Sequence, residues 1–129
     1  MTTTTTTTRE VAEAFAALCK AGRHEEAGER FWAEDVVSVE AMDGPMAELR
    51  GRAAVGGKSE WWYANHETHS AETTGPFVNG DRFALIFDLD VTAKADGRRI
   101  TMREVGLYTV RGDKVVEERF FYDPQQMAR

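Results

Sequence analysis

The second half of the sequence alternates long strand-like segments with short turn sequences, and this alternation constrains the fold more than any other feature. Residues 69–78, 82–94, 98–110 and 114–123 are rich in β-branched and aromatic side chains, and Asn79-Gly80-Asp81, Ala95-Asp96-Gly97 and Gly112-Asp113 separate them. Connections this short join antiparallel neighbours. The pattern therefore predicts four long strands in a meander, with Pro76 marking a bulge or an edge position.

The first half of the sequence predicts three helices and a short hairpin. Apolar residues recur at helical spacing in three segments, and β-branched residues take over between the second and the third. The expected elements are helices over Arg9–Ala21, over 24–32 with an end near Glu34 and Asp35, and from about Ala53, together with a strand over Val36–Met42 that returns through 46–51.

Helices followed by a meander of long strands predict an α+β domain in which a curved, mostly antiparallel sheet wraps around the three N-terminal helices. Such a sheet forms a cone-shaped barrel with an internal pocket. The 129 residues suffice for one such domain, which we place at 9–129. The tract Thr2–Thr8 offers little to a core, so residues 1–8 are expected to form a disordered polythreonine arm.

The charge of the chain argues against some classes of partner. Sixteen basic and twenty-two acidic residues give a formal charge of −6, and no segment is dense in lysine or arginine, so neither nucleic acid nor a membrane is an expected partner. Cys19, the single cysteine, is expected to be a small buried side chain in a reducing compartment. The first residues lack the features of a secretory signal, so we expect a cytoplasmic protein.

Three segments carry a family resemblance: "FWAEDVVSVEA" at the end of the helical pair, "LRGRAAV" before the third helix, and "GLYTVRGDKVVEERFFYD" at the end of the chain. In this order of elements the chain resembles the SnoaL-like branch of the nuclear-transport-factor-two-like superfamily. The resemblance implies a ligand pocket inside the cone and a homodimer formed through the outer sheet face. It implies no single reaction, because the superfamily includes isomerases, cyclases, hydrolases, dehydratases and non-catalytic modules.

Glu40 is the first candidate for acid-base chemistry. Its place in "DVVSVE" matches the carboxylate base of the related ketosteroid isomerases, and a carboxylate in an apolar cavity can take a proton from a carbon next to a carbonyl. The alternative is a structural ion pair with Arg50 or Arg52. The two hydrogen-bond donors of those isomerases fall at Phe15 and near Leu107, which cannot donate, so we do not expect a ketosteroid isomerase.

The turn at Gly112-Asp113 sets the expected register of the last two strands. Read as a two-residue turn, it pairs Leu107 with Glu118. Because Leu107 takes the place of an isomerase pocket residue, its face is assigned to the cavity, and the opposite face, which includes Glu104 and Tyr108, to a dimer interface. If the faces were exchanged, Glu104 would enter the cavity. The face assigned to the cavity presents Arg103, Val105, Leu107, Val116, Glu118, Phe120 and Tyr122.

The segment "WWYANHETHS", residues 61–70, concentrates aromatic, imidazole and carboxylate side chains. His66 and His69 could share a helix face and hold a metal, but zinc motifs use other spacings and the chain has only 3 histidines, so no metal site is predicted. Asn65, His66 and Glu67 are instead expected to hydrogen-bond the last carbonyls of the third helix. His66 also remains a candidate for proton transfer at the mouth of the cone.

These arguments leave more than one function open. One is a cofactor-free isomerase or lyase with Glu40 or His66 as its base, and an epoxide-hydrolase-like enzyme using Arg103 with Asp88 or Asp90 is a variant of it. Another is a non-catalytic ligand-binding or dimerisation module with the same cavity. In each case the expected ligand is a small, largely apolar molecule and no cofactor is required. The residues expected to contact the ligand are Trp61, His69, Asp90, Arg103, Glu118, Phe120 and Tyr122.

Overall fold

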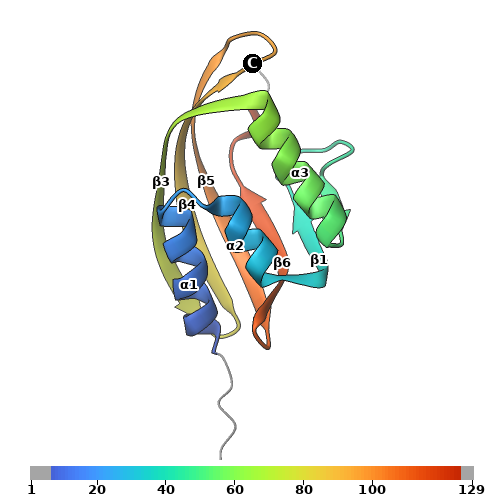
Figure 1. The fold of residues 1–129 in the computed structure, drawn as a ribbon, viewed down its shortest axis with the longest axis vertical. Helices are drawn as coiled ribbons and strands as arrows, with labels where there is room; N and C mark the ends of the chain where they lie inside the picture. Colours follow the sequence, from blue (N-terminus) through green and yellow to red (C-terminus); the bar gives the residue numbers. More distant parts are fainter. Residues whose placement is uncertain (1–6, 126–129) are drawn as a thin grey trace, which may run out of the picture.

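The computed structural model describes residues 7–125, and Figure 1 shows how its elements are arranged. Helices alternate with strands in the first half, and four long strands follow, as the sequence predicts. The elements are α1 (Thr8–Lys20), α2 (His24–Phe31), β1 (Trp32–Val39), β2 (Glu48–Arg50), α3 (Arg52–Asn65), β3 (His66–Asn79), β4 (Arg82–Ala93), β5 (Arg99–Arg111) and β6 (Lys114–Phe121).

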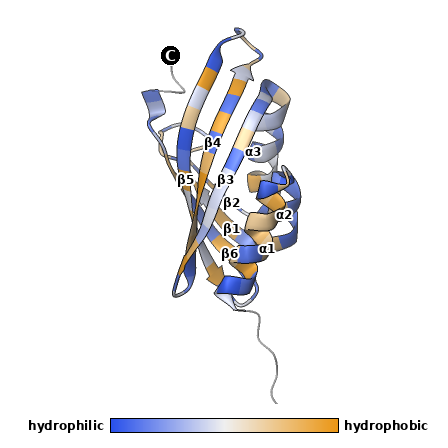
Figure 2. Ribbon diagram, turned by 90° about the vertical axis from the view of Figure 1, so that its left-hand side faces the viewer, coloured by the Kyte–Doolittle hydropathy of each residue, from blue (hydrophilic) through white to orange (hydrophobic). Residues whose placement is uncertain are grey.

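The strands form one sheet in the order β2-β1-β6-β5-β4-β3. Neighbouring strands are antiparallel except β1 and β6, which run parallel, so the sheet is mixed. The sheet curves around α1, α2 and α3, which cover its concave face, and no helix within residues 7–125 covers the outer face (Figure 1, Figure 2). The predicted α+β fold with a curved, mostly antiparallel sheet is confirmed, although β2 and β3 remain open edges and the barrel does not close.

The end of the threonine tract starts α1. The Thr7 hydroxyl oxygen accepts a hydrogen bond from the Glu10 amide at 3.1 Å, and the Glu10 carboxylate accepts one from the Thr7 amide at 3.3 Å. This reciprocal cap satisfies two amides that a helix start leaves without partners. The prediction of an arm over residues 1–8 is therefore wrong for Thr7 and Thr8, and the rest of the tract lies outside the described residues.

β1 begins earlier than its sequence predicts. The helical pattern continues through Trp32, yet α2 ends at Phe31 and Trp32 is already extended. The Trp32 ring lies against Gly28, at a place where any Cβ atom on residue 28 would overlap it. Glycine at this position lets the ring fold back beneath α2, and Trp32 is buried as the first residue of β1.

A bulge in β6 changes the register that the turn predicts. Val110 pairs with Val115 as expected, but Thr109 pairs with Glu117, so Val116 is an extra residue on β6. A shift of one residue moves every later side chain of the partner strand to the other face of the sheet.

The assignment of faces is therefore correct for Glu118, Phe120 and Tyr122 and wrong for β5. It is also wrong for Val115, which precedes the bulge and lies in the core. Tyr108, and not Leu107, lies opposite Glu118. Glu104 and Tyr108 face the helices, whereas Arg103 and Leu107 lie on the outer face. The cause is the extra residue, because the turn itself has the predicted length.

The core lies between the helices and the concave face of the sheet. Cys19 is buried there on α1, as predicted, and burial, with a smaller contribution from the charge of Glu118, raises the pKa of its thiol to about 12. A smaller cluster of Val91, Ile100 and Met102 lies nearer the β4–β5 turn. Within residues 7–125, no helix has the length and apolar character needed to cross a membrane.

Candidate functional site

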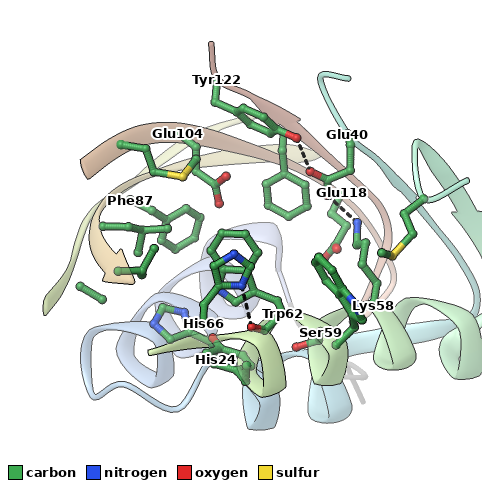
Figure 3. A pocket seen from close by; sticks show the side chains of 18 of the residues that line it. His24, Glu40, Lys58, Ser59, Trp62, His66, Phe87, Glu104, Glu118 and Tyr122 are labelled. Atoms are coloured by element: carbon green, nitrogen blue, oxygen red, sulfur yellow. Dashed lines mark hydrogen bonds and ion pairs between the residues drawn. The ribbon is translucent and has the colours of Figure 1, made fainter. Parts of the chain in front are cut away.

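A cavity of about 770 Å³ lies between the helices and the concave face of the sheet. Its volume is in the range of sites that bind drug-sized ligands. Aromatic and aliphatic side chains form most of its lining, and Figure 3 shows several of them around the central space. The polar groups on the lining fall into two sets: those with protein hydrogen-bond partners and those without.

Glu40, just after β1, has two partners. The Nζ atom of Lys58, on α3, lies 2.6 Å from one carboxylate oxygen, and the Tyr122 hydroxyl donates a hydrogen bond of 2.9 Å to the other (Figure 3). The Lys58 and Glu40 side chains are only 14% and 19% exposed, so water screens this ion pair weakly. The predicted ion pair with Arg50 or Arg52 is wrong, because Lys58 supplies the cation.

Glu118 on β6 belongs to the same network and is buried. One of its oxygens accepts a hydrogen bond from the Trp32 indole at 2.9 Å, and the other accepts one from the Ser38 hydroxyl at 2.8 Å. Lys58 also donates to Ser38, so a continuous chain of contacts joins Glu118 to Glu40. Burial raises the pKa of Glu118, and the two hydrogen bonds and the Lys58 charge oppose that rise.

Glu104 on β5 differs, because no group within residues 7–125 hydrogen-bonds its carboxyl group. The side chain points from the sheet into the cavity (Figure 3). Burial raises the pKa of Glu104 to about 8, the charges of Glu40 and Glu118 add to the rise, and Lys58 opposes it. At neutral pH Glu104 is therefore mainly the uncharged acid, which can donate a hydrogen bond or a proton.

Tyr108 is a second neutral donor on the same face of β5. Its ring packs against Phe15 and Phe83, and both centroid distances are 4.8 Å. The residue lies on the cavity lining and is only 2% exposed. No group among residues 7–125 hydrogen-bonds its hydroxyl. Burial, followed by the charge of Glu118, keeps its pKa well above the ordinary value, so the phenol stays protonated.

The Tyr108 ring leans along β5 in the direction of Glu104. Its hydroxyl oxygen would lie 2.8 Å from a Cβ atom on Gly106, the position between Tyr108 and Glu104 on this face. Same-face residues of a strand are spaced by roughly 7 Å. The lean therefore moves the hydroxyl one side-chain position toward Glu104.

His66 lies on the helix side of the cavity (Figure 3). Its ring stacks on Trp62 with a centroid distance of 3.8 Å, and Nδ1 lies 2.9 Å from the Trp62 carbonyl oxygen. A carbonyl only accepts, so Nδ1 carries a proton and the lone pair of the neutral ring is on Nε2. Nε2 has no hydrogen-bond partner within the described residues, and a lone pair of this kind can accept a proton from a ligand.

The turn from α3 to β3 matches the prediction in part. The Asn65 amide donates to the Trp61 carbonyl at 2.8 Å, and His66 donates to the Trp62 carbonyl, so both cap the helix as expected. Glu67 makes no such contact and already lies on β3.

The structure brings most of the predicted site residues together and leaves three outside. His69 lies on the outer side of β3, where Nε2 is 2.6 Å from the Thr92 hydroxyl. Asp90 and Arg103 also lie on the outer face, paired with Arg99 and Asp88 at 2.8 and 2.7 Å. Placing these three side chains at the cavity was wrong. The reason is the β6 bulge for Arg103, the inward-facing neighbours Leu89 and Val91 for Asp90, and a bulge between Thr68 and Ser70 for His69. The predicted residues on the cavity lining are Glu40, Trp61, His66, Glu118, Phe120 and Tyr122.

Two groups of the site were missed and one was named only as an alternative. Tyr108 was assigned to the outer face, and no residue near Val116 announces the bulge that reverses this assignment. Lys58 was not named, although a signal existed, because Val55, Lys58 and Trp62 follow at helical spacing and the flanking two are apolar. Glu104 was named only for the case of exchanged faces.

Metal binding has little support from the side chains of this site. Within the described part of the chain, no three histidine, cysteine, aspartate or glutamate side chains are grouped closely enough to hold a metal ion. The ring nitrogen of His66 and the Glu104 carboxyl group face the cavity singly, as hydrogen-bonding groups do in small-molecule sites.

Comparison with known proteins identifies the family. The SnoaL-like domain family matches residues 6–122. The chain belongs to this family. A SnoaL-like protein of Mesorhizobium loti, described as a candidate polyketide cyclase and also as a carbohydrate phosphatase, is 52% identical over 90% of this chain and 99% of its own, with a TM-score of 0.88.

More distant solved structures share the SnoaL-like fold. A nuclear-transport-factor-two-like protein of Burkholderia xenovorans is 22% identical over 98% of this chain and 96% of its own, with a TM-score of 0.74. A protein of unknown function with a cystatin-like fold from Xanthomonas campestris is 20% identical over 94% of this chain and 95% of its own, with a TM-score of 0.75. No curated protein matches the chain.

Proposed function

We propose that this SnoaL-like protein is a cofactor-free acid-base enzyme that moves a proton at the carbon next to the carbonyl group of a small, largely apolar molecule. The observation that supports this most is the pair of neutral donors, Glu104 and Tyr108, which face an apolar cavity with no protein partner. Both donors lie on the cavity lining, where an acceptor atom of a ligand can take up their hydrogen bonds.

The donors suit an oxygen on which negative charge develops. The Glu104 carboxyl and Tyr108 hydroxyl groups hydrogen-bond the carbonyl oxygen, and His66 Nε2 takes the proton from the neighbouring carbon. The electron pair of the broken C–H bond forms the C=C bond of an enolate, and the negative charge moves to the oxygen. Where a C=C bond of the ligand is conjugated with the enolate, return of the proton to the far carbon of that bond completes an isomerisation. Loss of a leaving group from the carbon next to the deprotonated one completes an elimination, so no co-reactant is needed.

The description of the Mesorhizobium loti relative as a candidate polyketide cyclase fits this chemistry, because ring closure at a carbon next to a carbonyl begins with removal of a proton from that carbon. An epoxide-hydrolase-like reaction has less support, since the Arg103 and Asp88 pair lies on the outer face. Glu40 is the second candidate base, although both of its oxygens already accept from Lys58 and Tyr122. A non-catalytic binding module remains the competing function.

The test is the exchange of hydrogen for deuterium next to a carbonyl. Dibenzyl ketone, which has acidic hydrogens beside an internal carbonyl, is incubated with the protein in D₂O, and deuterium uptake is followed by mass spectrometry. We expect uptake that exceeds buffer and falls about 100-fold or more in the double variant Glu104→Leu, Tyr108→Phe. Binding of the ketone without exchange above buffer would leave the binding module as the function.

We also propose that two copies associate through the uncovered outer face of the sheet. Ile86, Val105 and Phe121 are neighbours across three strands there, and Phe121 is 48% exposed. An exposed apolar patch with a charged surround is typical of protein interfaces. Sedimentation velocity should give a dimer for the wild type and a monomer for Val105→Glu, while Lys94→Glu, at the β4–β5 turn, stays dimeric. A monomeric wild type contradicts this proposal.

A further inference from the structure

We infer that the ligand is a neutral ketone whose carbonyl lies within an apolar skeleton, with apolar groups of comparable size on both sides. This inference rests on the proposed function, because it takes Glu104 and Tyr108 as the groups that bind the carbonyl oxygen. It is supported by the place of the donors between two apolar clusters, by the charges around them and by the volume of the cavity.

The donors lie between two separate apolar regions of the lining. On one side of Glu104 along β5 are Met102 and Ile100, which belong to the smaller cluster near the β4–β5 turn. On the other side, Tyr108 belongs to the larger cluster, as does Phe87, the residue opposite Glu104 on β4. A carbonyl held at this point therefore has apolar walls in both directions along the strand.

The charges around the donors disfavour an anionic ligand. Glu40 and Glu118 are the charged groups that raise the pKa of Glu104, so a ligand carboxylate near Glu104 would meet the same repulsion. Two cations lie on the lining: Lys58, which already contacts Glu40 and Ser38, and Arg98, which lies away from the donors at the β4–β5 turn. A neutral acceptor such as a ketone oxygen gains both hydrogen bonds without this electrostatic cost.

The volume of the cavity leaves space for two apolar arms. At about 770 Å³ it exceeds what a carbonyl with one short substituent would fill. Unfilled apolar space loses dispersion contacts, so a ligand with only one arm binds less tightly than one that reaches both clusters.

Four ligands with equal numbers of carbon atoms test the inference: dipentyl ketone, methyl nonyl ketone, undecanoate and undecane. Their affinities at pH 7 are measured through the fluorescence of the tryptophans that line the cavity, Trp32, Trp61 and Trp62. Dipentyl ketone should bind about threefold more tightly than methyl nonyl ketone and about tenfold more tightly than undecanoate. In Tyr108→Phe, the ratio of the affinity for dipentyl ketone to the affinity for undecane should fall about fivefold, because one hydrogen bond to the ketone is lost.

Methyl nonyl ketone or undecanoate binding as tightly as dipentyl ketone would overturn the inference. An unchanged preference for dipentyl ketone over undecane in Tyr108→Phe would overturn it too. If that variant does not fold, the same result in Glu104→Leu would do so. The deuterium exchange of dibenzyl ketone separates this result from the proposed function. Exchange without a preference for the internal ketone contradicts the inference alone, and the preference without exchange contradicts only the proposed catalysis.

Discussion

The hydroxyl oxygen of Tyr108 would lie 2.8 Å from a Cβ atom on Gly106, and the ring edge of Phe87 would lie 3.1 Å from it. Real Cβ atoms essentially never lie as close as 2.8 Å to a neighbouring atom, and 3.1 Å is already an unusually tight contact. The space beside Gly106 therefore exists only because this residue has no side chain. Its backbone is not in the left-handed region, which means that space and not conformation favours glycine here. The Tyr108 hydroxyl thus occupies space on the cavity side of β5 that a side chain at residue 106 would fill.

Gly106→Ala should therefore move the Tyr108 ring and weaken the site. We expect a loss of about 1–3 kcal/mol in the free energy of unfolding, typical of overpacking in a core, measured by urea denaturation. Deuterium exchange on dibenzyl ketone should fall about tenfold or more, because the donor leaves its place. Gly57→Ala is the matched control, since its Cβ meets nothing within 4 Å on α3, and it should raise stability by about 0.5–1 kcal/mol. Equal effects of the two substitutions would contradict the packing argument.

The raised pKa of Glu104 should make the stability of the protein depend on pH. Its pKa is about 8 in the folded protein against 4.5 for the ordinary side chain, so the unfolded chain releases this proton first as the pH rises. The contribution of Glu104 to stability is therefore lost progressively from about pH 4.5 to 8 and is constant above that window. Glu104→Gln removes this titration.

Urea unfolding of wild type and Glu104→Gln at pH 4 and pH 9 measures the effect. From pH 4 to pH 9 the wild type should lose stability that Glu104→Gln keeps. The difference in the free energy of unfolding, variant minus wild type, should therefore rise by on the order of 2 kcal/mol or more. Glu67→Gln, an exposed position on β3, should show no such gain and serves as the control. If the free energies of unfolding of the wild type and Glu104→Gln change equally with pH, the Glu104 carboxyl group is solvated like a surface group.

The network around Glu40 should show energetic coupling. Lys58→Met leaves the carboxylate of Glu40 shielded from water without its cation, so we expect a loss of about 2–4 kcal/mol. The double variant with Glu40→Gln should lose less than the sum of the two single losses, because the unpaired charge is gone. Arg103→Met removes an equally short ion pair whose side chains are 71% and 35% exposed, and we expect no measurable loss. Additive losses at Lys58 and Glu40 would show that the two residues act independently.

The sequence predicted the elements and the family better than it predicted the site. Turn sequences and strand periodicity place β3 to β6 within a few residues, because both signals are local. The face of β5 could not be predicted, because the extra residue Val116 changes the register without any change in the turn. The early start of β1 depends on Trp32 fitting against Gly28, a contact between side-chain volumes that hydrophobic periodicity does not report. A site assembled across a bulge therefore had to be found in the structure.

His66 and His69 offer the sharpest test of the proposed base, because they lie three residues apart in one strand, His66 at the cavity and His69 on the outer side. His66→Gln keeps an N–H that can donate to the Trp62 carbonyl but removes the ring lone pair, so the fold should persist while deuterium exchange on dibenzyl ketone falls about 100-fold or more. His69→Gln should leave the exchange rate within about twofold of the wild type, as expected for a surface substitution. If His66→Gln retains the rate and Glu40→Gln loses it, the base is Glu40, which then accepts the proton despite its contacts with Lys58 and Tyr122.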